Sequence, residues 1–161
     1  DKSNRELEVT RMSDLRREIE GQVTIGEKRE IVIDTSSDAY PSLIFRFFID
    51  SKADIDLEAE KLITQVHMAT VPMGKIEWSR AEKDLGINEV NDIEAKGSGW
   101  VTLHFTPPFS VFKSQYSLRW TLKGILIFKS NLGPISKVFS VQFTAKDTEL
   151  KTLLVRYPNL K

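Results

Sequence analysis

The sequence predicts a mainly β or α+β fold, in which an antiparallel sheet, sandwich-like or forming a partly open barrel, packs against one or two amphipathic helices. Two observations predict the sheet. Apolar residues alternate along 43–49, 117–130 and 139–145, and turn residues separate these runs. A helical spacing of apolar residues at 54–69 predicts the main helix. Because the 161 residues contain no repeat and no linker, we expect a single domain over 1–161.

The first 20 residues predict a flexible arm over 1–12 followed by a short helix. Met12, Leu15 and Ile19 are spaced as on one face of a helix, and Gly21 is a typical stop. An edge strand that begins near Leu7 is the alternative interpretation.

After Gln22 the apolar residues recur at every second position, as in a strand. Apolar residues at 23–25 and 31–33 flank a turn at 26–29, which predicts a hairpin. Residues 43–49 are largely apolar on both faces, and this pattern predicts a central strand that is covered on each side.

The segment 54–69 returns to helical spacing. Ala59, Leu62, Ile63 and Val66 predict an amphipathic helix that lies on the core, and Pro72 would end it. Residues 79–82 form a capping box, which predicts a further short helical turn.

The last third of the chain predicts strands. The strongest is 117–130, where Gly124 indicates a bulge or bend inside the strand. A turn at 131–134 and the alternation at 139–145 make an antiparallel hairpin with one solvated face. A helix over 147–157 is expected to follow.

Charge is distributed unevenly along the chain. Residues 1–94 hold 21 acidic and 13 basic side chains, whereas 95–161 hold 2 acidic and 10 basic ones. Such a split indicates either an anionic partner or head-to-tail self-association. The alternative is a fold that interleaves the two halves and mixes their charges.

The residues needed for catalysis are scarce, and we expect no enzyme, cofactor, metal site or small-molecule substrate. The only histidines are His67 and His104, and the chain has no cysteine. The acidic cluster at 50–60 lacks the glycine and the bidentate glutamate of a calcium loop, and the helix dipole accounts for acidic residues at a helix start.

Two surfaces are candidates for binding. The first is a basic stripe for anionic partners, formed by Lys113, Arg119, Lys123, Lys129 and Lys137. The second is a proline-fixed apolar loop formed by Pro107, Pro108, Phe109 and Phe112. The stripe is equally typical of a solvated strand, and the loop could fold back over the core as a lid.

The element order across 40–130 resembles the matrix proteins of rhabdovirus-like negative-strand RNA viruses. The elements that carry the resemblance are the helix arm, the long strand, the amphipathic helix, the Pro-Pro-Phe loop and the strand at 118–125. The resemblance implies self-association through a loop and an N-terminal arm, and contact with membrane and nucleoprotein through basic surface. The chain departs from the family in being neutral overall and in having Ser110 where a Pro-Pro-x-Tyr motif needs tyrosine.

These observations predict a non-enzymatic structural protein that self-associates and contacts an anionic membrane surface or nucleoprotein. The alternative is a β-sandwich binding module for a protein or anionic ligand, or a viral movement-type protein. No apolar run reaches the roughly 20 residues that span a bilayer, and the lack of cysteine fits a reducing compartment. We therefore expect a cytoplasmic location or the inner face of a virion, with export as the alternative.

Overall fold

The computed structural model describes residues 2–37, 41–82, 86–107, 119–145 and 157. Within these residues one helix precedes eight strands, and a 3-10 turn follows the fourth strand. The elements are α1 (Lys2–Gln22), β1 (Val23–Asp34), β2 (Ser42–Ser51), β3 (Glu58–Met68), β4 (Val71–Ser79), η1 (Arg80–Glu82), β5 (Glu89–Val90), β6 (Ser98–Phe105), β7 (Arg119–Ser130) and β8 (Gly133–Thr144).

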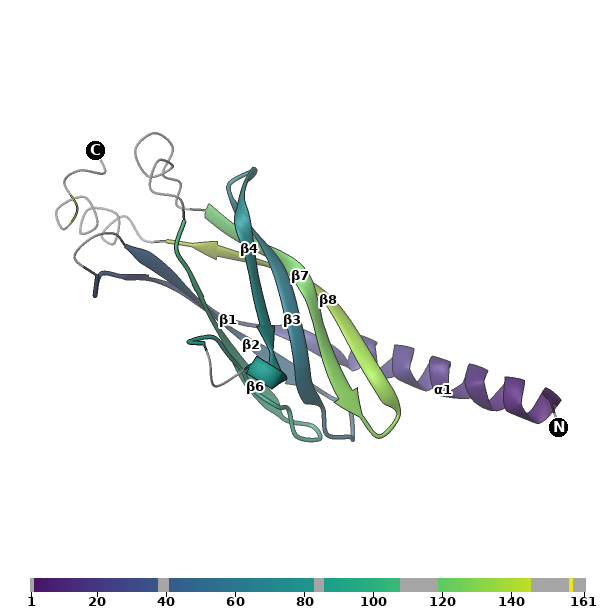
Figure 1. The fold of residues 1–161 in the computed structure, drawn as a ribbon. Helices are drawn as coiled ribbons and strands as arrows, with labels where there is room; N and C mark the ends of the chain where they lie inside the picture. Colours follow the sequence, from purple (N-terminus) through teal and green to yellow (C-terminus); the bar gives the residue numbers. More distant parts are fainter. Residues whose placement is uncertain (1, 38–40, 83–85, 108–118, 146–156, 158–161) are drawn as a thin grey trace.

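The strands form two antiparallel sheets that face each other as a sandwich (Figure 1). The first sheet has the order β1-β2-β6-β5, and the second has the order β4-β3-β7-β8. The sheets do not close into a barrel, so the mainly β, antiparallel prediction is confirmed in its sandwich form. The short turn predicted after β4 is also present, as η1.

Aromatic side chains from both sheets fill the space between them. Phe45 of β2 lies 5.0 Å from Phe143 of β8, centroid to centroid, and Phe47 lies 5.6 Å from Phe139. Trp120 of β7 also contacts Phe45, and its exposed fraction is 1%. Rings in these tilted and edge-on arrangements join the two sheets through one continuous core.

The central strand predicted at 43–49 is confirmed as β2, which pairs with β1 on one side and β6 on the other. Its odd-numbered residues, Leu43, Phe45, Phe47 and Ile49, are buried. Its other face is partly exposed, and Arg46 on that face is exposed. Coverage on both faces was therefore wrong, because the sandwich has only two layers and the outer face of each sheet meets solvent.

The amphipathic helix predicted at 54–69 is wrong, because this segment contains strand β3. The register of β3 against β7 shifts between Ala59 and Lys61, as a β-bulge does. The extra residue places Ala59 and Leu62 on the same inner face, and Val66 follows after two more pleats. A bulge therefore produced the i, i+3, i+7 spacing of a helix, and the buried polar Thr64 further hid the alternation.

The hairpin predicted at 23–33 is also wrong. Residues 23–34 form one long strand, β1, whose register against β2 shifts between Ile25 and Arg29. Gly26 lies within this irregular stretch, where a Cβ atom would lie 3.2 Å from the Cβ atom of Phe48. The polar residues at 26–29 thus mark a bulge that is paired on one side, not a reversal of the chain.

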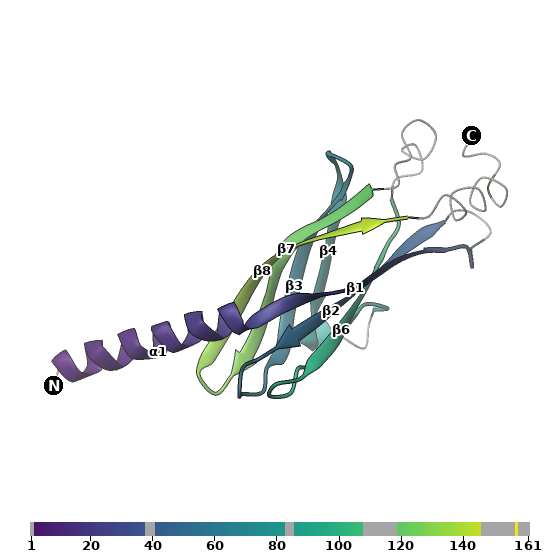
Figure 2. The same ribbon diagram turned by 180° about the vertical axis from the view of Figure 1, so that it is seen from behind.

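Helix α1 is longer than predicted, because the residues expected to form an arm continue the helix back to Lys2. Its last turns lie against the second sheet. The Arg16 Nη1 atom donates to the Leu132 carbonyl at 2.9 Å, and Lys137 Nζ donates to the Glu20 carbonyl at 3.0 Å. Its N-terminal turns extend away from both sheets (Figures 1 and 2).

The β7–β8 hairpin is confirmed, with an unbroken register from Arg119 opposite Thr144 to Ser130 opposite Gly133. Of the bulge or bend predicted at Gly124, the bulge is wrong, since neither neighbour of β7 shifts register there. The helix predicted at 147–157 lies outside the described residues, except for Tyr157. The Tyr157 side chain is buried, and its hydroxyl donates to the Ser37 carbonyl.

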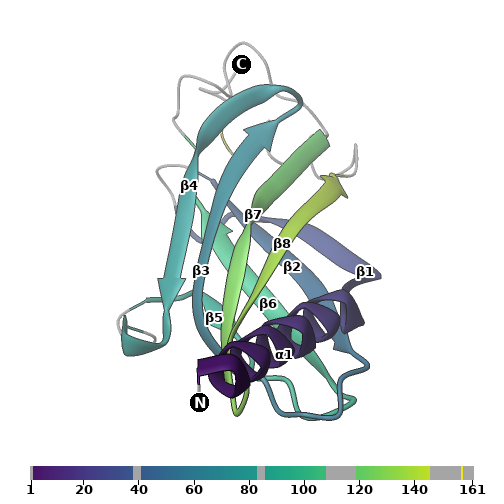
Figure 3. The same ribbon diagram turned by 90° about the vertical axis from the view of Figure 1, so that its right-hand side faces the viewer.

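The two differently charged halves of the chain are interleaved. Strand β6, from the basic half, lies between β2 and β5 of the acidic half. In the same way, β7 and β8 join β3 and β4 to make the second sheet (Figure 3). Each sheet therefore contains strands from both halves of the chain, and head-to-tail pairing of an acidic half with a basic half loses its basis.

Candidate binding surface

The outer face of the second sheet carries a row of apolar side chains that crosses three strands. Ile63 of β3 lies opposite Ile125 of β7, which in turn lies opposite Val138 of β8. The two isoleucines are half-buried, whereas 74% of Val138 is exposed. Inward positions of the same strands belong to the core, so this row is a separate apolar feature at the surface.

Basic side chains lie in the rows on both sides of this apolar row, and Glu77 of β4 lies opposite Ile63 at its end. Lys123 and Lys75 lie in the next row of the sheet, where each pairs in register with Gln65. Lys61 lies in the row on the other side, opposite Ile127. We call this surface the basic face and define it by Lys61, Lys75, Arg119, Lys123 and Lys129, all of which are exposed.

Three of the five residues of the predicted basic stripe belong to this face. Arg119, Lys123 and Lys129 share the outer side of β7, as the alternation predicted. Lys137 does not join them, because its ammonium group binds the carbonyl of Glu20 at the end of α1. Lys113 lies outside the described residues.

Carboxylates also lie on this face, where Glu77 pairs with Lys75 and where Glu58, Glu60 and Asp92 share Arg80. Glu77 is 3.0 Å from Lys75, and its pKa is lowered first by the hydrogen bond from Lys75 and then by the charge of that ammonium group. Glu58 and Glu60 lie 3.7 and 3.8 Å from Arg80. Within the described part of the chain, no ion pair involves Lys61, Lys123 or Lys129, so these three lysines contribute net positive charge.

Half of the residues on this surface were not predicted from the sequence. Lys61 and Ile63 were not recognised because the helix predicted at 54–69 placed them on a different element, and Lys75 was missed because the pairing of β4 with β3 was not predicted. Val138 would have been found from the alternation of β8, in which it stands between the buried Ile135 and Phe139.

The predicted interaction loop is only partly described. Pro107 is buried. The preceding Thr106 hydroxyl shares a hydrogen bond of 2.9 Å with the Ser42 hydroxyl and so joins the end of β6 to the start of β2. Pro108, Phe109 and Phe112 lie outside the described residues.

The two histidines lie on different sheets, and the structure does not bring them together. His67 is on β3 and faces Thr121 of β7, whereas His104 is on β6 and faces Ile44 of β2. Among the residues that the structure describes, no group of three or more histidine, aspartate or glutamate side chains could hold a metal ion.

The acidic residues near β3 stabilise a loop. The Asp92 carboxylate accepts hydrogen bonds from the Ala59 amide at 2.9 Å and from Arg80, and the Asp56 carboxylate accepts one from the Ala95 amide at 2.9 Å. A hollow of about 580 Å³ lies beside them, bordered also by Lys129. These hydrogen bonds give the Asp56 and Asp92 carboxylates a structural role, which is to hold the 92–95 segment in place.

Comparison with solved structures finds chains of similar fold. The structural-genomics target SoR45 superposes with a TM-score of 0.55 at 11% identity, covering 80% of this chain and 91% of that one. A protein described as ApaA from Bordetella pertussis gives 0.51 at 8% identity, covering 78% and 94%. AT1g01470 from Arabidopsis thaliana gives 0.51 at 12% identity, covering 77% and 87%.

The similarity at these identities concerns the fold alone. No protein-family model matches the chain, and no curated protein matches it in sequence. Within the described residues, no helix has the length and apolar character needed to cross a membrane.

Proposed function

We propose that this chain is a non-enzymatic β-sandwich interaction module that attaches reversibly to an anionic membrane surface through its basic face. The observation that carries the proposal is the combination of lysines with an exposed aliphatic row on one sheet. Lys61 and Lys123 flank Ile63, Ile125 and Val138, and no described side chain covers Val138 from outside.

A lipid headgroup region suits this combination better than a nucleic acid does. Lysine ammonium groups can contact lipid phosphates while short aliphatic side chains enter the boundary between headgroups and acyl chains. Nonspecific binding of single-stranded nucleic acid depends on aromatic side chains for base stacking. The rows around Ile125 present aliphatic residues, hydroxyls and lysines instead.

The expected affinity is modest. Each basic side chain near an anionic surface contributes about 1 kcal/mol, so the three lysines without an ion pair contribute about 3 kcal/mol together. This corresponds to a roughly 100-fold preference for anionic over neutral lipid, which is lost as salt increases. Binding of this strength is peripheral and reversible.

The test is flotation with vesicles of phosphatidylcholine, with and without phosphatidylserine. We expect binding only to the anionic vesicles, and at least a tenfold loss in the triple variant K61Q/K123Q/K129Q. The control K28Q/K52Q/R17Q removes the same charge from exposed positions elsewhere and should bind as the wild type does. Equal loss in both variants, or equal binding to neutral vesicles, contradicts the proposal. Salt-sensitive binding to RNA but not to vesicles would instead favour a nucleoprotein partner.

The matrix-like role, the viral setting and the cytoplasmic or virion location stay predictions. The resemblance that led to them included an amphipathic helix at 54–69, and strand β3 occupies that position. Self-association has a separate basis in α1, which does not depend on the charge split.

A further inference from the structure

We infer that α1 is a dimerisation element, whose projecting turns pair antiparallel with the same turns of a second copy of this chain. The inference is independent of membrane attachment. It rests on the exposed part of the helix, on the side chains that continue its buried face, and on the order of charges along that face.

The side of α1 that packs on the sandwich continues beyond the sandwich. Ile19 is 7% exposed, and Arg16 binds the Leu132 carbonyl. Met12 and Val9 follow at helical spacings toward the N-terminus, and 66% of Val9 is exposed. The last turns of α1 therefore contact the sandwich, whereas the turns around Val9 and Met12 have no such contacts within the described residues.

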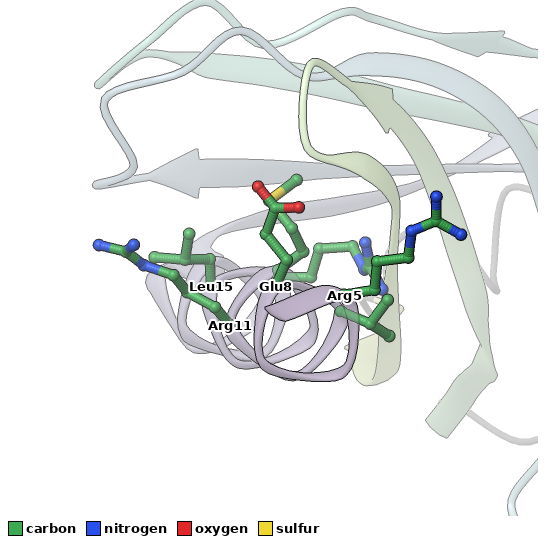
Figure 4. Close-up of a pocket in the computed structure, with 7 residues that line it drawn as sticks. Arg5, Glu8, Arg11 and Leu15 are labelled. Atoms are coloured by element: carbon green, nitrogen blue, oxygen red, sulfur yellow. The ribbon is translucent and has the colours of Figure 1, made fainter. Parts of the chain in front are cut away.

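A hollow of about 850 Å³ lies along this side of the helix. Its border includes Arg5, Glu8, Val9, Met12 and Leu15, all of which come from α1. Figure 4 shows Arg5, Glu8 and Leu15 pointing to the same side of the helix. A short helix without tertiary contacts is only marginally stable in water, so a partner helix would stabilise this segment.

The order of side chains along the hollow fits a second copy in an antiparallel arrangement. With Met12 on the two-fold axis, residues equally far before and after it face each other across the pair. Val9, three residues before, then faces Leu15 of the second copy. Glu8, four residues before, faces Arg16 of the second copy, and symmetry repeats both contacts.

The same charges disfavour the other occupants. A parallel pair would set Glu8 against Glu8 and Arg16 against Arg16. An anionic membrane would attract the arginines of this face but repel Glu8, and α1 as a whole carries five acidic and five basic residues and has no net charge. A self-complementary partner is the one that uses both signs of charge on this face.

The pair is expected to be weak. It involves only the turns around Met12, because the second sheet already occupies the surface near Ile19. Helices that cross at an angle contact each other over a short length and then diverge, which keeps the N-terminal turn clear of the β7–β8 hairpin. A contact this small lies below the usual size of stable interfaces, so we expect a Kd on the order of 100 µM.

The test uses the absence of cysteine, because a single introduced cysteine can form a disulfide only between two chains. M12C places the thiols at the axis, whereas L7C places them on another side of the helix at a residue that is 69% exposed. Under mild oxidation we expect M12C to form a linked dimer at least ten times faster than L7C. E8R introduced into M12C should slow the linkage at least tenfold.

Sedimentation of the wild type provides a second measurement. We expect a monomer at about 10 µM and a growing dimer fraction toward about 1 mM, without larger species. Equal rates for M12C and L7C, a monomer at every concentration, or an open series of larger species overturns the inference. None of these measurements contains lipid, so their outcome is separate from vesicle binding.

Discussion

Gly124 of β7 lies directly opposite Thr64 of β3, and the two backbones approach so closely that no side chain fits at position 124. A Cβ atom there would lie 2.1 Å from the carbonyl oxygen of Ile63 and 2.6 Å from the Cα atom of Thr64. Both neighbours are backbone atoms of a central strand, so neither can move aside without displacing the sheet. The same two strands carry Ile63 and Ile125 on their outer side.

The first prediction is that G124A destabilises the protein by about 2–3 kcal/mol, since an added methyl group must force the two strands apart. Chemical denaturation followed by tryptophan fluorescence measures this change. The control is G21A, because no atom lies within 4 Å of a Cβ atom at that helical position. G21A should raise stability by about 0.5–1 kcal/mol, and a G124A variant as stable as the wild type would contradict the close approach.

The second prediction concerns the contact between the sheets. F45A should cost about 3–5 kcal/mol, because Phe45 is fully buried between Trp120 and Phe143. Thermal unfolding measures the loss, and F48A is the comparison. Phe48 lies on the outer face of the same strand, and its ring centroid is 4.4 Å from that of Trp100. Truncating Phe48 should therefore cost much less stability. Similar losses for the two variants would show that the core is not where the structure places it.

The third prediction concerns the bulge in β3. Arg80 Nε donates to the Ala59 carbonyl at 2.8 Å, while Asp92 accepts from the Ala59 amide and binds Arg80. R80A should destabilise the protein by about 1–2 kcal/mol, because it removes charge-assisted hydrogen bonds at a half-buried site. Equilibrium unfolding in urea measures this change in stability. K75A removes only an exposed ion pair and should shift the unfolding midpoint much less than R80A does.

The fourth prediction concerns pH. Lys75 lowers the pKa of Glu77, so the pair stabilises the folded state above the ordinary pKa of glutamate. This contribution is lost as the pH falls through the lowered pKa, where the carboxylate becomes protonated. A carboxyl titration followed by NMR should place the midpoint of Glu77 below its ordinary value. K75M should raise it toward that value, with Lys61 still lowering it, and an unchanged midpoint in K75M would exclude Lys75 as the cause.

The alternation of apolar residues predicted most of the second half of the fold. In β7 and β8 the pairing has no irregularity, so each odd–even alternation along the sequence maps directly onto an inner and an outer face. The outward position of Arg119, Lys123 and Lys129 follows from the same rule. Sequence alone was sufficient here because strand geometry is local.

The first half was predicted poorly for an equally physical reason. Bulges in β1 and β3 insert residues that change the phase of the alternation, and a phase change at Ala59 produces helical spacing. A bulge is stabilised by contacts far along the chain, in this case by Arg80 and Asp92. Local sequence patterns do not contain those contacts.

The sequence by itself determined that the chain is β-rich, that β2 is a central strand and that the outer side of β7 is basic. Only the tertiary structure decided that β3 is a strand and that Lys61 and Ile63 stand beside Lys123 and Ile125. It also decided that the acidic and basic halves are mixed in both sheets. The reason is that periodicity reports which side of an element faces the core, whereas the neighbours of that element depend on pairing between residues that are distant in sequence.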